Sequence, residues 1–131
     1  MRRRVAAARV ARLGSVSASG APGLVPFCFA LAGDVLYSAV DRKPKRTTRL
    51  GRLRNVRAEP RVAVLVDHYE EDWSRLWWVR IDGRALELEA GEEAEGALRR
   101  LRDKYAQYAA APPEGPVLRI DAERWVGWSA S

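Results

Sequence analysis

Apolar and polar positions alternate in several short stretches of the chain, which is the pattern of strands that bury one face. The first stretch covers Arg9–Ser17 and is followed by small and turn-forming residues at 18–22. Leu24–Leu31 is apolar on both alternating faces, so we expect a strand that is covered on both sides. Gly33-Asp34 separates this strand from Val35–Val40, and glycine at the first position of a two-residue turn predicts an antiparallel hairpin.

The second half of the chain carries further strand and helix patterns. Arg61–Asp67 reads as a buried strand, Trp77–Leu88 as a longer alternating strand, and residues 117–121 as a final strand that leads into residues 124–128. Two helices are predicted, one that stops at Glu59-Pro60 and one that follows the long strand. Their apolar positions at helical spacing are Leu50, Leu53 and Val56 in the first and Ala94, Ala97, Leu98, Leu101 and Tyr105 in the second.

These elements predict the fold class. A chain of 131 residues has room for one compact domain, which we expect to cover residues 1–131. The chain is too short for a doubly wound sheet. We therefore expect an α+β, mainly β fold, built as a six-stranded antiparallel barrel with two or three flanking helices.

Cysteine content and hydropathy bear on the compartment. Cys28 is the only cysteine, which excludes a disulfide framework and fits a reducing cytosol. No apolar stretch approaches the roughly 20 residues that cross a bilayer. Residues 1–8 are too short for a signal peptide. We expect a cytoplasmic protein without a membrane partner.

The formal net charge of +6 comes mainly from arginine, which is spread along the chain from Arg2 to Arg124. An anionic ligand, a nucleic acid and an arginine-rich composition without functional meaning are all compatible with this charge. The charge alone therefore selects no function.

The most informative cluster is the basic segment at the predicted strand-to-helix junction. Its cations are Arg42, Lys43, Lys45 and Arg46, and its hydroxyls are those of Thr47 and Thr48. Helix N-termini attract anions and repel cations, so a bound phosphate would resolve the conflict between these cations and the helix dipole. The alternative is a solvated turn with Thr47 or Thr48 as the helix cap, because the segment lacks a glycine-rich phosphate cradle.

The order of these parts resembles a known superfamily. An apolar strand with an internal proline, a hairpin strand ending in Tyr37-Ser38, the basic segment, a helix closing with residues 54–60 and a further apolar strand are similar to the pyridoxamine-phosphate-oxidase-like, FMN-binding split-barrel proteins. Residues 43–46, 67–69, 72–80 and 124–128 resemble an actinobacterial branch of F420-dependent enzymes. The resemblance covers the chain from about Ala8 onward and implies a split β-barrel.

The resemblance also implies a homodimer with two coenzyme sites at its interface, each lined by both subunits. In such proteins the strand-to-helix turn holds the coenzyme phosphate, and neighbouring strands contact the ring. By this resemblance the phosphate-binding residues are Arg42, Lys43, Lys45, Arg46 and Thr47, and the ring-contacting residues are Pro26, Phe27, Tyr37, Ser38, Trp78 and Arg80. No catalytic residue is implied.

Two departures from the superfamily pattern bear on the substrate. Pyridoxamine-phosphate oxidases usually carry a glutamine near the position of Trp78, and their basic terminal segment is replaced here by Trp125 and Trp128. Pyridoxamine phosphate is therefore not the substrate we expect.

The residues around His68 leave alternatives open. One histidine and one cysteine cannot form a typical four-ligand zinc site, so no metal is predicted. His68 and Asp67 end a strand or line the substrate pocket, and axial ligation of haem, which some split barrels bind, is a further alternative. Tyr69, Trp73 and Trp77 form either an aromatic wall for a flat acceptor or anchors of the core and the interface.

The resemblance favours an oxidoreductase that uses coenzyme F420 to transfer hydride to or from a small-molecule substrate. FMN is the alternative coenzyme, and a non-catalytic coenzyme carrier is the alternative role. Nucleic-acid binding through the arginine-rich surface is the third hypothesis and the least favoured, because no nucleic-acid-binding motif is present.

Overall fold

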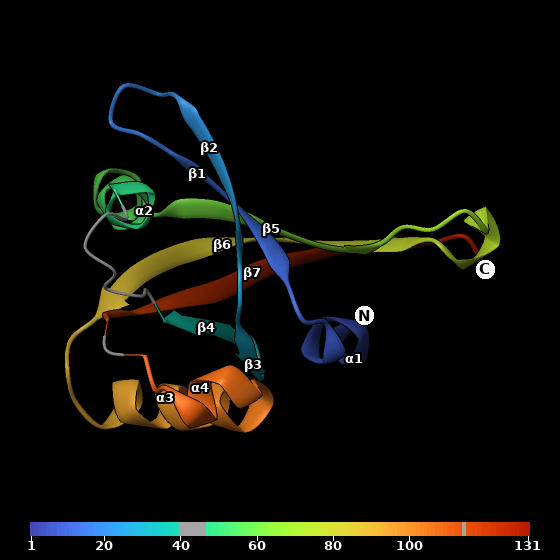
Figure 1. The fold of residues 1–131 in the computed structure, drawn as a ribbon. Coiled ribbons are helices and arrows are strands. Elements are labelled where there is room, and N and C mark those ends of the chain that lie inside the picture. Colours follow the sequence, from blue (N-terminus) through green and yellow to red (C-terminus); the bar gives the residue numbers. More distant parts are fainter. Residues whose placement is uncertain (40–46, 114) are drawn as a thin grey trace.

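The computed structural model describes residues 1–39, 47–113 and 115–131, with side chains described for the same ranges except 47–52. A short helix opens the chain, a long strand closes it, and the remaining helices lie between strands (Figure 1). In chain order the elements are α1 (Arg2–Ala7), β1 (Ala11–Val16), β2 (Pro22–Phe27), β3 (Ala30–Ala32), β4 (Val35–Ala39), α2 (Thr47–Ala58), β5 (Arg61–His68), the short 3-10 helix η1 (Trp73–Arg75), β6 (Trp77–Leu88), α3 (Glu92–Lys104), α4 (Ala106–Ala110) and β7 (Val117–Ser129).

All strands belong to one antiparallel sheet with the order β2-β1-β5-β6-β7-β4-β3. The α+β, mainly β class is confirmed, but the sheet has seven strands rather than six. The difference arises at Cys28-Phe29, where the apolar run Leu24–Leu31 divides between β2, which pairs with β1, and β3, which pairs with β4. These two strands form the edges of the sheet, and no pairing of described residues closes it into a barrel.

The predicted hairpin around Gly33-Asp34 is confirmed. Ala32 pairs with Val35 across a two-residue turn, and Gly33 has a φ of 62°. A positive φ at the first turn position alone corresponds to a type II′ turn, which a residue with a Cβ adopts only with strain.

One face of the curved sheet carries the main core. Buried side chains from β1, β5, β6 and β7 meet there, and Val5 of α1 and Leu53 and Val56 of α2 belong to the same cluster. Both helices therefore cover the core side of the sheet. The alternation predicted for Trp77–Leu88 is confirmed, because Val79 and Ile81 are buried while Arg80 and Asp82 point away from the core.

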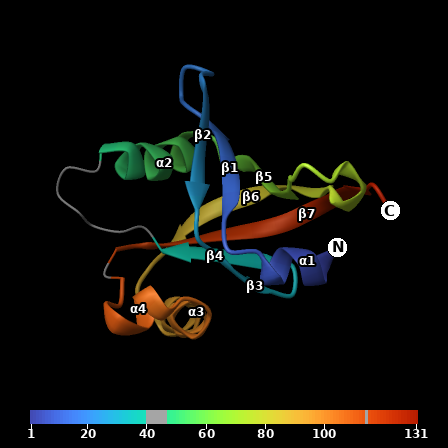
Figure 2. The same ribbon diagram turned by 45° about the vertical axis from the view of Figure 1, so that its right-hand side comes forward.

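Helices α3 and α4 pack on the opposite side of the sheet, near β3 and β4 (Figure 2). Ala94, Ala97 and Leu101 are buried, which confirms the helical face predicted from their spacing. Three glutamates in the first turn of α3 and two cations in its last turn interact favourably with the helix dipole and stabilise the helix. No helix among the described residues is long and apolar enough to cross a membrane.

Tyr105 connects the end of α3 to the segment between β2 and β3. Its hydroxyl accepts a hydrogen bond from the backbone N–H of Phe29 at 3.1 Å and lies 2.9 Å from the carbonyl oxygen of Arg9.

We expect Tyr105→Phe to lower the free energy of unfolding by about 1–3 kcal/mol, because the buried Phe29 N–H loses its acceptor. Urea unfolding measures this loss. Tyr69→Phe is the control, since Tyr69 is exposed, and a loss of equal size there would contradict the explanation.

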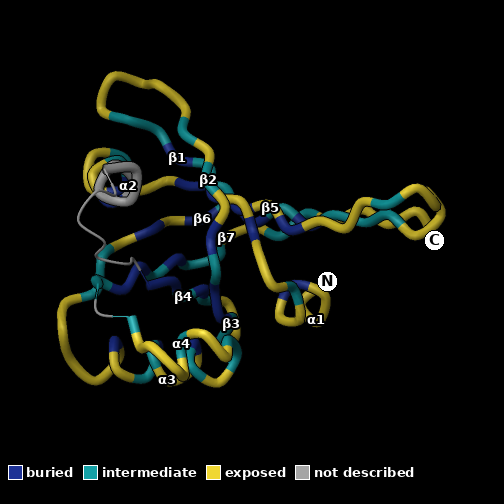
Figure 3. Tube along the Cα trace, viewed as in Figure 1, coloured by how far each residue is buried: buried dark blue, intermediate teal, exposed yellow. Residues whose placement is uncertain are grey.

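Strands β5, β6 and β7 continue beyond the rest of the sheet as a projecting arm (Figure 1). Asp67 and His68 at the end of β5 pair with Trp78 and Trp77, and Trp78 pairs in turn with Trp128 of β7. Most of this arm is exposed or partly exposed (Figure 3). Trp78 and Trp128 thus lie on the arm, whereas Trp77 and Trp125 pack against the main core.

Candidate functional site

The outward face of β2, β1, β5 and β6 has no described helix over it. Cross-strand pairing places Pro26, Arg12, Leu65, Arg80 and Val126 in one row across five strands. Side chains alternate between the faces of a strand, and cross-strand partners point to the same side. The row therefore forms a continuous outward surface, in which Pro26 is exposed and Leu65 keeps 38% of its surface accessible.

A cavity of about 380 Å³ lies on the arm next to this row. Its walls come from the end of β5, the turn that follows, the first residues of β6 and the end of β7. The lining residues are Leu65, Asp67, His68, Tyr69, Leu76, Trp77, Trp78, Arg80 and Trp128. A mostly apolar, aromatic cavity of this size with a few polar groups is typical of small-molecule sites.

The charged side chains at the cavity are already paired. The Arg80 guanidinium donates to Asp82 from Nε to Oδ1 at 3.0 Å and from Nη2 to Oδ2 at 3.3 Å. Asp67 Oδ1 lies 3.5 Å from Nη1 of Arg12. These partly exposed pairs add little stability. They do balance the charge of the walls, so the cavity favours an uncharged ring over a free anion.

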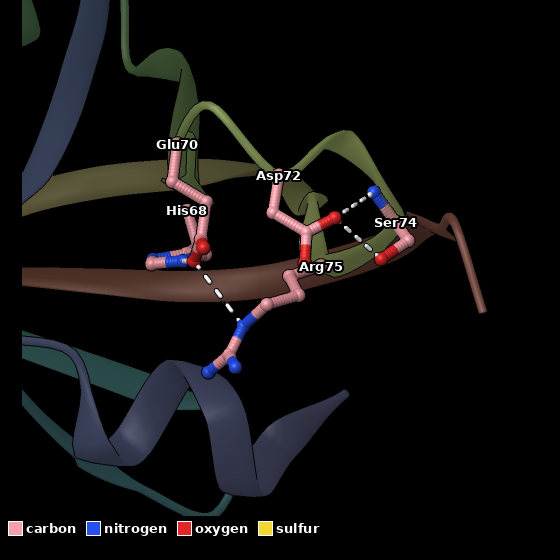
Figure 4. A network of polar contacts seen from close by, with 5 residues as sticks. All are labelled: His68, Glu70, Asp72, Ser74 and Arg75. Carbon is pink, nitrogen blue, oxygen red and sulfur yellow. Dashed lines mark hydrogen bonds and ion pairs between the residues drawn. The ribbon is translucent and has the colours of Figure 1, made fainter.

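A polar network holds the turn between β5 and β6 (Figure 4). Tyr69 and Leu76, which belong to this turn, line the cavity. Oδ1 of Asp72 accepts hydrogen bonds from the backbone N–H of Ser74 at 3.1 Å and from its hydroxyl at 2.6 Å. Glu70 contacts Nε2 of His68 and lies 3.4 Å from Nε of Arg75. The network fixes the end of the arm and occupies one ring nitrogen of His68.

The structure brings three of the predicted ring-contacting residues to one face. Pro26, Trp78 and Arg80 all point outward, and Trp78 and Arg80 line the cavity. Phe27 and Ser38 are buried instead, with 5% and 1% of their surfaces exposed. As they stand, Phe27 and Ser38 are core residues.

Tyr37 lies elsewhere, on the side of the sheet that α3 covers. Its hydroxyl donates to Oε2 of Glu93 at 2.7 Å, and its ring packs in the cluster of Ala94, Ala97 and Val117. Partial burial, followed by the contact with Glu93, raises the pKa of the Tyr37 hydroxyl above its usual value. Tyr37 therefore holds α3 on β4 in the described chain.

The predicted phosphate-binding residues are not tested by the structure. Arg42, Lys43, Lys45 and Arg46 lie outside the described residues. Thr47 is the first residue of α2, and its side chain is not described.

The predicted site residues divide between two ends of the sheet. Tyr37 pairs with Arg119, which pairs with Leu86 of β6, whereas Trp78 lies at the other end of β6. A strand rises about 3.3 Å per residue, so Leu86 and Trp78 are about 26 Å apart along β6. Within one chain, the Tyr37–Ser38 end and the Trp78 end do not meet.

Sequence reasoning missed three residues of the cavity, Leu65, Leu76 and Trp128. The pattern of Arg61–Asp67 predicts a buried strand, but within it only Val62, Val64 and Val66 are buried. The interpretation of Leu24–Leu31 as covered on both sides was likewise wrong for Leu24, which is 74% exposed. In both strands large apolar residues occupy both faces. Because only one face packs in the core, the apolar residues of the other face indicate a surface outside the core. Of the three residues predicted as a possible aromatic wall, Tyr69 and Trp77 line the cavity and Trp73 does not.

Fold and site together define a mainly β protein with an aromatic cavity on an open sheet face. The family model described as pyridoxamine 5′-phosphate oxidase matches residues 1–129. The chain therefore belongs to this family. The match confirms the resemblance to the pyridoxamine-phosphate-oxidase-like superfamily. A search of curated proteins found no match.

Solved structures share the fold over almost the whole chain. A FAD-binding protein from Mesorhizobium loti is 25% identical, with a TM-score of 0.69, and the match covers 96% of this chain and 89% of that one. A conserved hypothetical protein from Mycobacterium tuberculosis is 19% identical, with a TM-score of 0.76 and coverage of 98% and 81%. HutZ, a heme storage protein from Vibrio cholerae, is 13% identical, with a TM-score of 0.71 and coverage of 92% and 85%.

Proposed function

We propose that this protein is an oxidoreductase that binds coenzyme F420, or alternatively FMN, and acts on a small-molecule substrate. The observation that carries the proposal is the aromatic cavity with Trp78 and Arg80 in its wall, in a chain of the pyridoxamine 5′-phosphate oxidase family. The FAD-binding protein of similar fold supports a flavin-type coenzyme. F420 is the finer part of the proposal and rests on the sequence resemblance.

The residues of the cavity fit a flat heterocyclic ring. Trp78 and Trp128 are cross-strand neighbours whose side chains offer apolar surface, and the volume lies within the range of small-molecule sites. A bound flavin or deazaflavin supplies hydride-transfer chemistry itself. The chain's task is to orient the ring, to exclude water with Leu65 and the tryptophans, and to hold the phosphate at Arg42, Lys43 and Lys45.

The proposal includes a homodimer, because the site is incomplete in one chain. Trp78 and Arg80 stand at one end of β6, whereas Ala39, from which the basic segment continues, pairs with Val117 opposite Leu88 at the other end. A coenzyme that contacts both the ring residues and the basic segment therefore needs two copies. The outward row with Pro26 and Leu65 is the surface on which the second copy would pack.

We expect the wild-type chain to be a dimer and Leu65→Asp to be a monomer, because the substitution buries a carboxylate in the proposed interface. Size-exclusion chromatography with light scattering measures the mass. Gln107→Glu is the matched control, since Gln107 is exposed on α4, which packs near β3 and β4 rather than over β2, β1, β5 and β6. A wild-type monomer, or a Leu65→Asp dimer, would contradict the assignment of the interface.

Titration of the purified protein with F420 and with FMN tests the proposed function. Micromolar binding of one coenzyme followed by turnover with an acceptor panel supports an oxidoreductase. Binding without turnover favours the coenzyme carrier. Failure to bind either coenzyme overturns the proposal, and a steeply salt-dependent nucleic-acid shift would then favour the third hypothesis.

Haem binding is the second candidate, because His68 lies in the cavity wall and HutZ shares the fold. It is weaker, since Nε2 of His68 contacts Glu70. Haem added to the wild type and to His68→Ala separates the cases: a Soret shift that disappears with His68 supports haem ligation, and its absence from both proteins excludes it.

A further inference from the structure

Two arginine–aspartate pairs flank the aromatic cavity. Arg80 lines the cavity and pairs with Asp82, two residues further along β6. Asp67 lines the cavity as well and pairs with Arg12 of β1. In each pair one member belongs to the cavity wall and its partner does not. The four side chains together carry no net charge, so the charge of the cavity depends on residues outside its wall.

Asp82 holds the Arg80 side chain in place. Residues two apart on a strand point to the same side, so both side chains lie on the outward face of β6. The guanidinium donates to both carboxylate oxygens, from Nε at 3.0 Å and from Nη2 at 3.3 Å. A bidentate pair fixes the plane of the guanidinium as well as its position. Asp82 therefore determines where the positive charge beside the cavity lies and how far it is balanced.

Asp82 lies between two cations. Cross-strand pairing places Arg124 of β7 opposite Asp82, and cross-strand partners point to the same side of the sheet. Its partner on the other neighbouring strand, β5, is Ala63, which carries no charge. Removal of the Asp82 carboxylate would leave the charge of Arg80 uncompensated, and the charge of Arg124 would add to it.

The rest of the wall gives an anion little to bind. Leu65, Leu76 and the indole rings are apolar, and the carboxylate of Asp67 repels negative charge. Arg80 is the only arginine or lysine in the wall of the cavity as described. An anion that enters must either displace Asp82 from Arg80 or remain unpaired, and an unpaired ion in an apolar site is strongly unfavourable.

We propose that the cavity admits uncharged aromatic molecules and rejects aromatic anions, and that Asp82 sets this selectivity by holding and neutralising Arg80. Asp82 acts through Arg80 and does not itself contact the ligand. Asp67 acts in the same direction through its pair with Arg12. As a statement about the natural substrate the inference rests on the proposed function, and it assigns an uncharged aromatic compound to the site.

Displacement of a neutral dye from the full chain, without coenzyme, tests this selectivity. N-phenyl-naphthylamine, whose fluorescence rises in apolar sites, is bound first. Trp78→Ala should abolish its binding, which places the dye in the cavity. Naphthalenemethanol and naphthoate then compete with the dye. The two competitors share one ring system and differ in charge, so the ratio of their inhibition constants measures charge selectivity at this site alone.

For the wild type we expect the inhibition constant of naphthoate to be about 10-fold higher than that of naphthalenemethanol, because its carboxylate loses water without gaining a partner. Asp82→Asn should lower the naphthoate constant about three- to fivefold and leave that of the alcohol unchanged. The change is small because 42% of the Arg80 side chain and 39% of the Asp82 side chain are accessible to solvent. Asp82→Glu keeps the charge and should keep the wild-type ratio, and high salt should remove most of the gain in Asp82→Asn.

Glu123→Gln is the matched control. Oε2 of Glu123 lies 3.2 Å from Nε of Arg84, which is about 13 Å from Arg80 along β6. The control removes the same charge from the chain at a distance from the cavity, so its ratio should equal that of the wild type. The inference is overturned by a wild-type ratio near one, by an unchanged ratio in Asp82→Asn, by an equal change in Glu123→Gln, or by dye binding that is absent or survives Trp78→Ala. None of these measurements involves a coenzyme, so failure of this inference and failure of the proposed function are distinguishable.

Discussion

Trp78→Ala is expected to weaken coenzyme binding about 10- to 100-fold, the largest effect of any single substitution in the cavity. Trp78 pairs with Asp67 on one side and Trp128 on the other, so it occupies the middle of the aromatic wall. Stacking of a flat heterocycle on an aromatic side chain contributes about 1–3 kcal/mol, judged by alanine substitution. Titration of F420 and FMN into wild-type and variant protein measures the change in Kd.

Trp73→Ala is the matched control for this prediction. Trp73 lies in η1 at the end of the same arm, is 67% exposed and does not line the cavity. Both variants remove an indole from the arm, but only Trp78→Ala removes one from the proposed site. Equal loss of affinity in the two variants, or none in Trp78→Ala, would show that the cavity is not where the ring binds.

The fold was predictable wherever a pattern depends on neighbouring residues in the chain. The long strand beginning at Trp77, the turn at Gly33 and the buried face of α3 follow from local alternation or helical spacing, and each is confirmed. The division of Leu24–Leu31 was not predictable in this way. An apolar run has the same pattern whether it forms one strand or two. Here its first part pairs with β1 and its last part pairs with β4.

The candidate site depends on register between strands, which local patterns do not contain. Trp128 is 50 residues from Trp78 in the sequence, and only the pairing of β6 with β7 makes them neighbours. The resemblance selected Trp78 and Arg80, which line the cavity, and their contact with a coenzyme stays a prediction. It also selected Phe27 and Ser38, which the described chain buries in its core. A sequence motif indicates which positions belong to a site, but the strand pairing determines the face of the sheet on which each side chain lies.

Gly83→Ala is expected to lower the free energy of unfolding by about 3 kcal/mol or more, because backbone atoms occupy the space of the new methyl group. A Cβ at Gly83 would lie 2.2 Å from the carbonyl oxygen of Asp121, which cannot move without breaking the β6–β7 pairing. The register shifts here, with Asp82 opposite Arg124 and Gly83 opposite Ala122. This bulge joins the core half of the two strands to the arm that carries the cavity, so the variant should also lose coenzyme affinity.

Urea unfolding measures the stability, and Gly14→Ala is the control, since its Cβ would meet only ordinary contacts at 3.6 Å or more. Equal stability of the two variants would mean that the β6–β7 pairing tolerates a side chain at its bulge.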